Sequence, residues 1–244
     1  MKINCDEFEK SIRDEGLVLS KRTVTAICVA IKDNSNMMFA GVPGTGKTET
    51  AHAIAKVLFG GSRDDNFNNK FHRITAYQGL TRQDFFGDWD HKKQFLKVQA
   101  ACSNKVCSAD DVIDNVYNEE FFIPGPATNA IKTNGIFFVD EGNRGGEEFQ
   151  NMMLEIAQEK QVTIPMMKSI RGKDGMPIVI VTYNEQDIAV SSFSDAFTRR
   201  FQRIPFTPPP LKDAIEIWEK RYGKNILEET HKIVKNAAGF GDKK

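Results

Sequence analysis

The spacing of apolar residues along the 244-residue chain predicts an alternation of helices and strands. Residues 20–33 carry apolar side chains at helical intervals behind Ser20, a residue type that caps helices, and residues 6–16 predict a helix before them. The apolar positions of the longer helix are Val24, Ile27, Cys28 and Ile31. They indicate a helix that packs on the core.

Further along the chain, short apolar runs are separated by turns and amphipathic segments. Residues 36–60 predict a strand, a loop and a helix, and 147–160 predict a second helix. Further strands are expected at 71–78, 135–141, 161–165, 176–186 and 201–206. The runs GIFFV and PIVIV do not alternate with polar residues, which is typical of strands covered on both faces in a parallel sheet. The pattern predicts an α/β fold with a parallel sheet.

Two regions depart from this alternation. Residues 79–120 mix aromatic and charged residues with two candidate helices, and we interpret them as an insertion at the rim of the sheet. After the prolines of "PFTPPP", 207–244 predict two amphipathic helices, an abbreviated helical lid or extension. The expected organisation is an α/β domain over 1–206 with this short piece behind it.

Composition narrows the class of protein only slightly. The 33 basic and 33 acidic residues cancel, so no global field favours nucleic acid or membranes. No run approaches the ~18 apolar residues of a membrane span, and the N-terminus lacks the order of a signal peptide, so we expect a cytoplasmic protein. The four cysteines are too sparse for a disulfide framework, and we expect reduced thiols rather than a zinc site.

A phosphate-binding loop lies between the first strand and its helix. The sequence GVPGTGKT fits G-x-x-x-x-G-K-[ST] in the strand-loop-helix context that this motif requires. Its glycines let backbone N–H groups converge on phosphates, Lys47 supplies a point charge, and the Thr48 hydroxyl can hold magnesium. The predicted nucleotide-binding residues are Gly41, Val42, Pro43, Gly44, Thr45, Gly46, Lys47, Thr48 and Glu49. A glycine-rich turn that binds nothing is the alternative.

Two adjacent carboxylates end the strand at 136–140. Asp140 should reach the magnesium shell at the carboxyl edge of the sheet, where ligands of open α/β folds bind. Glu141, one residue further, can take a proton from an attacking water. A solvated acidic turn is the alternative interpretation.

These motifs resemble the AAA+ ATPases, a P-loop NTPase superfamily, and within them the MoxR group. GVPGTGKT is similar to the family's phosphate loop, FFVDEGNR to its D-E-x-N-R motif, and LTRQDFFG, FIPGPATNAIKTNG and MMLEIAQEKQVTIP follow in the family's order. The resemblance spans about 20–206 and implies a nucleotide-binding domain whose parallel five-stranded sheet is flanked by helices. It implies an ATPase that uses ATP and Mg²⁺ in a homo-oligomeric ring, expected to be hexameric.

The resemblance also assigns roles to residues beyond the phosphate loop. Asn184 matches the sensor asparagine that orients the attacking water. Arg199 or Arg200 matches the arginine finger that reaches a neighbouring subunit, and Arg200 is the first choice. Gly142 stands where the family favours an aliphatic residue, while Arg144 matches the family arginine. The family usually supplies a second sensor arginine on a later helix of its lid; only 38 residues follow Phe206 here, and Arg221 is a candidate substitute.

Three functions remain open at this point. The resemblance favours an ATP-driven ring that remodels or activates a protein client. The insertion would then face the client. Its aromatic residues either contact the client or pack in the core; they are Phe85, Phe86, Trp89 and Phe95. A McrB-like GTP- or ATP-driven motor acting on DNA is the alternative, although no basic stripe is evident. The third is a switch that binds nucleotide to assemble without sustained turnover.

Overall fold

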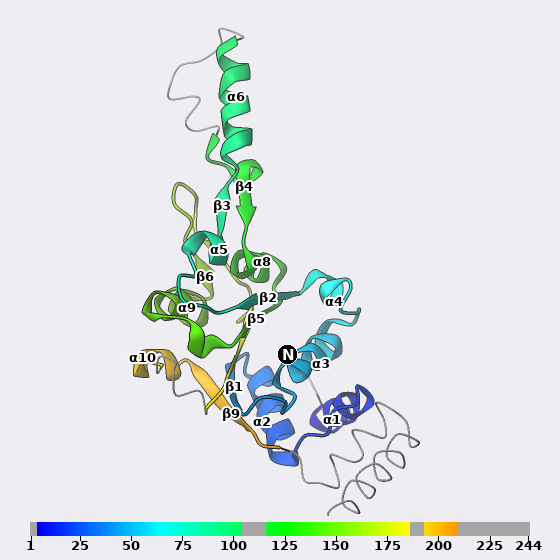
Figure 1. Cartoon of the computed structure of the whole chain (residues 1–244). Helices are drawn as coiled ribbons and strands as arrows, with labels where there is room; N and C mark the ends of the chain where they lie inside the picture. Colours follow the sequence, from blue (N-terminus) through cyan, green and yellow to red (C-terminus); the bar gives the residue numbers. More distant parts are fainter. Residues whose placement is uncertain (1–3, 104–115, 186–192, 209–244) are drawn as a thin grey trace, which may run out of the picture.

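The core of the protein is a five-stranded parallel sheet in the order β2-β5-β8-β1-β9 (Figure 1). The computed structural model describes residues 4–103, 116–185 and 193–208. Across the sheet the strands are β2 (Phe71–Thr75), β5 (Ile136–Asp140), β8 (Ile178–Tyr183), β1 (Asn36–Gly41) and β9 (Phe201–Phe206). Each neighbouring pair is parallel, as the unbroken apolar runs predicted.

Side chains of the central strands alternate between two separate cores. In β5, Ile136 and Phe138 face one core, while Phe137 and Val139 face the other. All four are completely buried, because helices cover both faces of the sheet. The fold is therefore the helix-sheet-helix architecture of a P-loop NTPase.

One face of the sheet carries the N-terminal helices and the helix after the phosphate loop. These are α1 (Cys5–Asp14), α2 (Lys21–Lys32), α3 (Lys47–Phe59) and the short α4 (Asn66–Asn69). Ser20 caps α2 by accepting a hydrogen bond from the Thr23 amide at 3.1 Å. The four apolar residues predicted to pack on the core from α2 are all buried.

The expectation of reduced thiols is wrong for two of the four cysteines. Cys5 and Cys28 form a disulfide that joins α1 to α2, with their Cα atoms 5.8 Å apart. Sequence spacing did not indicate it, because helix packing brings together residues 23 positions apart. The side chain of Cys102 and all of Cys107 lie outside the described residues.

The other face carries a second group of helices and a small hairpin. The helices are α5 (Arg82–Phe86), α8 (Pro126–Thr133), α9 (Glu147–Glu159) and α10 (Asp195–Thr198). The hairpin pairs β6 (Gln161–Val162) with β7 (Ile170–Arg171), so the strand expected at 161–165 lies outside the main sheet. The structure also contains two 3₁₀ turns, η1 (Glu119–Phe121) and η2 (Gly142–Arg144).

Residues 87–103 and 116–124, which begin inside the predicted insertion and end just after it, form an arm that projects from the sheet domain, whereas α5, at the start of that insertion, packs on the sheet (Figure 1). The base of the arm is the antiparallel pair β3 (Gly87–Trp89) and β4 (Phe122–Pro124), and α6 (His91–Ser103) extends beyond it. Phe85 and Phe86 are buried in the second core, whereas Phe95 is 61% exposed. Trp89 makes edge contacts with Tyr117 and Phe122 at the base of the arm.

Two further observations concern the chain as a whole. The predicted lid helices within 209–244, including Arg221, lie outside the described residues. Within the described ranges, every helix is too short or too polar to cross a lipid bilayer.

Candidate functional site

The phosphate loop connects β1 to α3 at the carboxyl edge of the sheet. Gly44 and Gly46 have φ values of +80° and +84°, a left-handed conformation that glycine adopts without a Cβ penalty. Gly46 precedes the first residue of α3 and has no side chain to cap that helix. The first N–H groups of α3 are therefore left to an outside acceptor, and the helix dipole favours an anion there.

Lys47 lies across the loop that precedes it. Its Nζ donates hydrogen bonds to the carbonyl oxygens of Gly41, at 2.6 Å, and Val42, at 2.9 Å. Burial lowers the pKa of Lys47, and the carboxylates of Asp140 and Glu185 partly oppose that shift. The ammonium group is thus held near the start of α3, where it can bind phosphate oxygens.

The carboxylate of Asp140 is hydrogen-bonded through both oxygens. Thr182, on β8, donates its hydroxyl to Oδ1 at 2.6 Å, and Arg73, on β2, donates from Nη2 to Oδ2 at 2.6 Å. Sequence reasoning did not identify Arg73. Its available signal was the parallel pairing of two predicted strands, which places Arg73 beside Phe138, two residues before Asp140.

Glu141 follows the strand in a left-handed conformation, with φ of +53°. Its backbone N–H donates to the Thr182 hydroxyl at 3.1 Å, so one threonine fixes both acidic residues. The Glu141 carboxylate is 45% exposed and pairs with Arg144 Nη1 at 2.9 Å. Asn143 donates from its side chain to the Asn184 carbonyl at 3.3 Å, which ties the two loops together.

These groups line one cavity of about 430 Å³, a size usual for small-molecule sites. It brings the loop together with the strand ends and with the predicted sensor. The predicted residues that line it are Pro43, Gly44, Thr45, Gly46, Lys47, Thr48, Glu49, Asp140, Glu141 and Asn184. Gly41 and Val42 contribute the carbonyls that hold Lys47.

Arg199 and Arg200 do not line this cavity. They follow α10, and the Arg200 guanidinium is bound by Gln158 Oε1, at 2.6 Å from Nη2, and by the Ala196 carbonyl. The Arg199 side chain is exposed, and within the described ranges no side-chain hydrogen bond or ion pair engages it.

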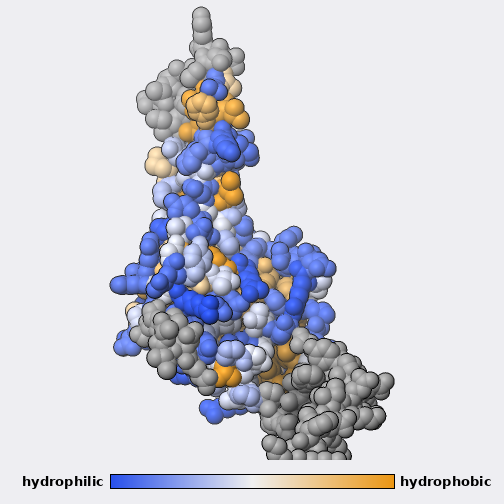
Figure 2. Space-filling view, in the orientation of Figure 1, coloured by the Kyte–Doolittle hydropathy of each residue, from blue (hydrophilic) through white to orange (hydrophobic). Residues whose placement is uncertain are grey.

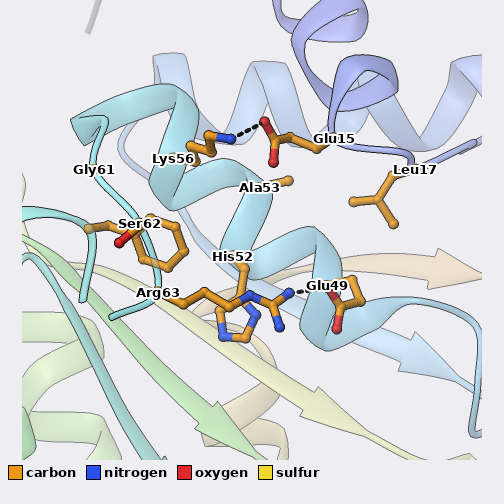
Figure 3. Close-up of a pocket in the computed structure, with 10 residues that line it drawn as sticks. Glu15, Leu17, Glu49, His52, Ala53, Lys56, Gly61, Ser62 and Arg63 are labelled. Atoms are coloured by element: carbon orange, nitrogen blue, oxygen red, sulfur yellow. Dashed lines mark hydrogen bonds and ion pairs between the residues drawn. The ribbon is translucent and has the colours of Figure 1, made fainter. Parts of the chain in front are cut away.

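A second cavity, of about 190 Å³, adjoins the first on the flank of α3 (Figure 3). Glu49 lines both cavities and pairs with Arg63, while Lys56 and Glu15 form an ion pair at 2.6 Å at the other end. His52 lies between them, and its buried Nδ1 has no hydrogen-bond partner in the described part of the chain. The pKa of His52 is lowered mainly by burial and, to a smaller extent, by the positive charge of nearby Arg63.

The donor set of the first cavity fits magnesium rather than zinc or calcium. Among the described residues there is no cluster of three or more His, Cys, Asp or Glu side chains able to hold a metal alone. Mg²⁺ takes one or two protein oxygens and completes its shell with phosphates and water. The Thr48 hydroxyl and the Asp140 carboxylate, both lining the cavity, suit that arrangement.

Solved structures show the same fold at low sequence identity. A presumed ATPase from Cytophaga hutchinsonii ATCC 33406 superposes with a TM-score of 0.55 at 19% identity, over 91% of this chain and 58% of that one. The complex of BchI and BchD subunits of magnesium chelatase gives 0.55 at 15% identity, over 88% and 69%. The ADP complex of S. cerevisiae Hsp104 gives 0.56 at 15% identity, over 95% and 41%.

The sequence itself matches one family. No curated protein matches the chain significantly. The AAA domain of the dynein-related subfamily matches residues 36–201, from the first residue of β1 to the first residue of β9. That range contains the phosphate loop, both strand-end carboxylates and the Asn184 loop. The chain therefore belongs to the dynein-related subfamily of AAA domains.

Proposed function

We propose that this protein is an ATPase that binds Mg²⁺-ATP, hydrolyses it within a homo-oligomeric ring, and uses the reaction to remodel or activate a protein partner, as in the MoxR group. The observation that carries the proposal is the single cavity lined by Lys47, Thr48, Asp140, Glu141 and Asn184. It contains donors for phosphate, oxygens for magnesium, and a carboxylate beyond the strand end.

The chemistry follows from where each group lies. Lys47 and the N–H groups at the start of α3 would bind the outer phosphates, and Thr48 and Asp140 would hold the metal. Bound magnesium supplies charge neutralisation at the phosphate oxygens. Glu141 accepts the proton of the attacking water, since its carboxylate is partly exposed and its backbone is fixed by Thr182. Asn184 orients that water from the facing loop.

Assembly is supported by the placement of the candidate arginine finger. Neither candidate arginine lines the cavity of its own chain, so either would have to serve a neighbouring one. Arg200 is engaged by Gln158 and Ala196, whereas Arg199 is exposed and unengaged within the described ranges. We therefore assign the finger to Arg199, in place of the sequence-based first choice of Arg200. A hexamer is the expected ring.

The arm is the proposed contact with a client protein. Phe95 and Leu96 of α6 are 61% and 63% exposed, and Figure 2 shows apolar surface along the arm amid a largely hydrophilic molecule. Phe85 and Phe86, which are buried, stabilise the base of the arm rather than grip a partner. Exposed apolar groups on a projecting element are typical of interaction sites.

A DNA-acting, McrB-like motor is the second candidate, because α6 also exposes Lys92, Lys93 and Lys97 and contains no acidic residue. The deciding experiment captures partners on the Glu141→Gln variant in the presence of ATP, since a stalled remodeller retains its client. Recovery of a protein that the Phe95→Ala form of the same variant fails to retain supports the first candidate. Recovery of DNA alone, with turnover stimulated by DNA, favours the second.

The third candidate, a nucleotide-dependent assembly switch without turnover, is tested separately. Assembly and phosphate release are measured together at the concentrations where oligomers form. Sustained release excludes the switch, and ATP-dependent oligomers without release would establish it.

A further inference from the structure

Arg73 approaches the proposed magnesium ligand from outside the nucleotide cavity. It lies on β2, the edge strand, opposite Phe138 in the register with β5, and its guanidinium lies 5.8 Å from the centre of the Phe138 ring. The side chain is 48% exposed, whereas Asp140 is only 15% exposed. Arg73 is absent from the cavity lining, so it contacts the carboxylate without facing the phosphates directly.

We propose that Arg73 competes with magnesium for the Asp140 carboxylate and so weakens the contribution of the metal to nucleotide binding. This inference rests on the proposed function. A divalent cation that approaches Asp140 meets a guanidinium already 2.6 Å from Oδ2. The two cations repel each other and compete for one carboxylate.

Orientation of the carboxylate does not depend on Arg73 alone. The Thr182 hydroxyl holds the other oxygen at 2.6 Å and is itself fixed by the Glu141 amide at 3.1 Å. Removing Arg73 therefore leaves Asp140 aligned while taking away a competing positive charge. The electrostatic effect should exceed the loss of alignment, and magnesium should bind more tightly.

The structure offers a close control for this effect. Arg82 is 49% exposed, lies 4.6 Å from the Phe86 ring, and pairs with Glu155 at 3.7 Å. It thus has the exposure, ring contact and acidic partner of Arg73. However, it lies beside the base of the arm and does not line the nucleotide cavity.

The test measures the affinity of a fluorescent ATP analogue in EDTA and in saturating magnesium, and takes the ratio of the two. By linkage, this ratio is also the factor by which the protein strengthens magnesium binding to the nucleotide. Parent, Arg73→Gln, Arg73→Lys and Arg82→Gln proteins are compared, with thermal unfolding as the check on folding. If Arg73→Gln unfolds, Arg73→Met keeps an apolar stem over Phe138 and also removes the charge.

The expected result is a magnesium ratio that rises on the order of tenfold in the neutral Arg73 variants. It should stay within about twofold of the parent in Arg73→Lys, which keeps the charge, and in Arg82→Gln. An unchanged or lower ratio in a folded neutral variant overturns the inference while leaving the proposed function intact. A parent whose nucleotide affinity does not respond to magnesium overturns both.

Discussion

At the residue scale, Thr182 and Lys47 organise the site. One hydroxyl, on β8, positions the carboxylate of Asp140 and the backbone of Glu141, so two adjacent acids have separate and fixed directions. Lys47, opposite them, is held by two carbonyls of its own loop. Its charge therefore reaches the cavity at little additional cost in side-chain entropy.

Substitution of Lys47 by alanine should weaken nucleotide binding strongly. Hydrogen bonds to charged groups contribute about 1.5–3 kcal/mol, so we expect a loss of roughly 10- to 100-fold in affinity. Isothermal titration with ATP and magnesium measures it. Lys56→Ala is the matched control, because Lys56 lies on the same helix but pairs with Glu15 at the far end. Equal losses in the two variants would contradict the role given to Lys47.

The sequence predicted Lys47, Asp140 and Glu141 because each stands at a fixed place in a local motif, whereas it did not identify Thr182. A buried run that ends in Asp140 sets that carboxylate at the sheet edge, whatever the rest of the chain does. Arg73 and the Cys5–Cys28 disulfide were missed because they depend on which elements pack side by side. A pattern within one element carries no information about that.

At the element scale, Asn36 and Lys160 join the ends of four elements away from the cavity. The Asn36 amide, at the start of β1, donates to the carbonyls of Ala157 on α9 and Arg200 before β9. Lys160, which caps α9, donates to Asn36 Oδ1 and, at 2.8 Å, to the carbonyl of Pro177 before β8. The network thereby links the helix that follows the Glu141 loop to the strand that follows Arg199 and Arg200.

This network predicts a stability that changes with pH. Burial lowers the pKa of Lys160 to about 8, whereas an unfolded lysine titrates at about 10.4. Below pH 8 both states bind the proton and the folded state bears the cost of a buried charge. Above pH 8 the folded state releases it first, so stability rises with pH towards 10.4.

The measurement is urea unfolding of the parent and of Lys160→Gln between pH 7 and 10. The difference in unfolding free energy, parent minus variant, should increase by up to about 1.4 kcal/mol for each pH unit above pH 8. Lys132→Gln, at an exposed ion pair with Glu119, serves as the control and should show no such trend. A difference that is constant with pH would mean that Lys160 does not titrate in this range.

The arm was the least predictable element. Its described sequence mixes aromatic and charged residues without a single period, and only the packed structure separates the buried Phe85 and Phe86 from the exposed Phe95. By contrast, the periodic helix at 20–33 and the continuous apolar strands agreed closely with expectation. Strong local periodicity is what sequence reasoning detects best.

At the scale of the whole molecule, the proposed mechanism requires each subunit to supply an arginine to the nucleotide cavity of its neighbour. The two arginines after α10 lie away from the cavity of their own chain, and only Arg199 is unengaged within the described ranges. An arginine supplied by a neighbour stabilises charge on the transferring phosphoryl group and is worth roughly 10³-fold or more in rate. Activity should consequently depend on assembly.

Mixing of variants tests this dependence. Arg199→Ala and Lys47→Ala proteins should each be inactive alone, and mixing them should restore part of the turnover, because Lys47→Ala subunits offer an intact Arg199 to an intact cavity. Arg200→Ala should mainly lower the melting temperature by releasing its contacts with Gln158 and Ala196. If turnover were restored when Arg200→Ala is mixed with Lys47→Ala, but not when Arg199→Ala is, the arginine finger would be Arg200 instead.

The central claim is that Glu141 converts a nucleotide-binding cavity into a hydrolysing one. The most direct measurement compares ATP affinity and phosphate release for the parent and Glu141→Gln at concentrations where the protein is assembled. The account predicts unchanged affinity, within about twofold, and release slower by roughly 10²-fold or more, because the general base is lost while the phosphate contacts remain. Hydrolysis by Glu141→Gln at the parent rate, with the same affinity, would contradict it.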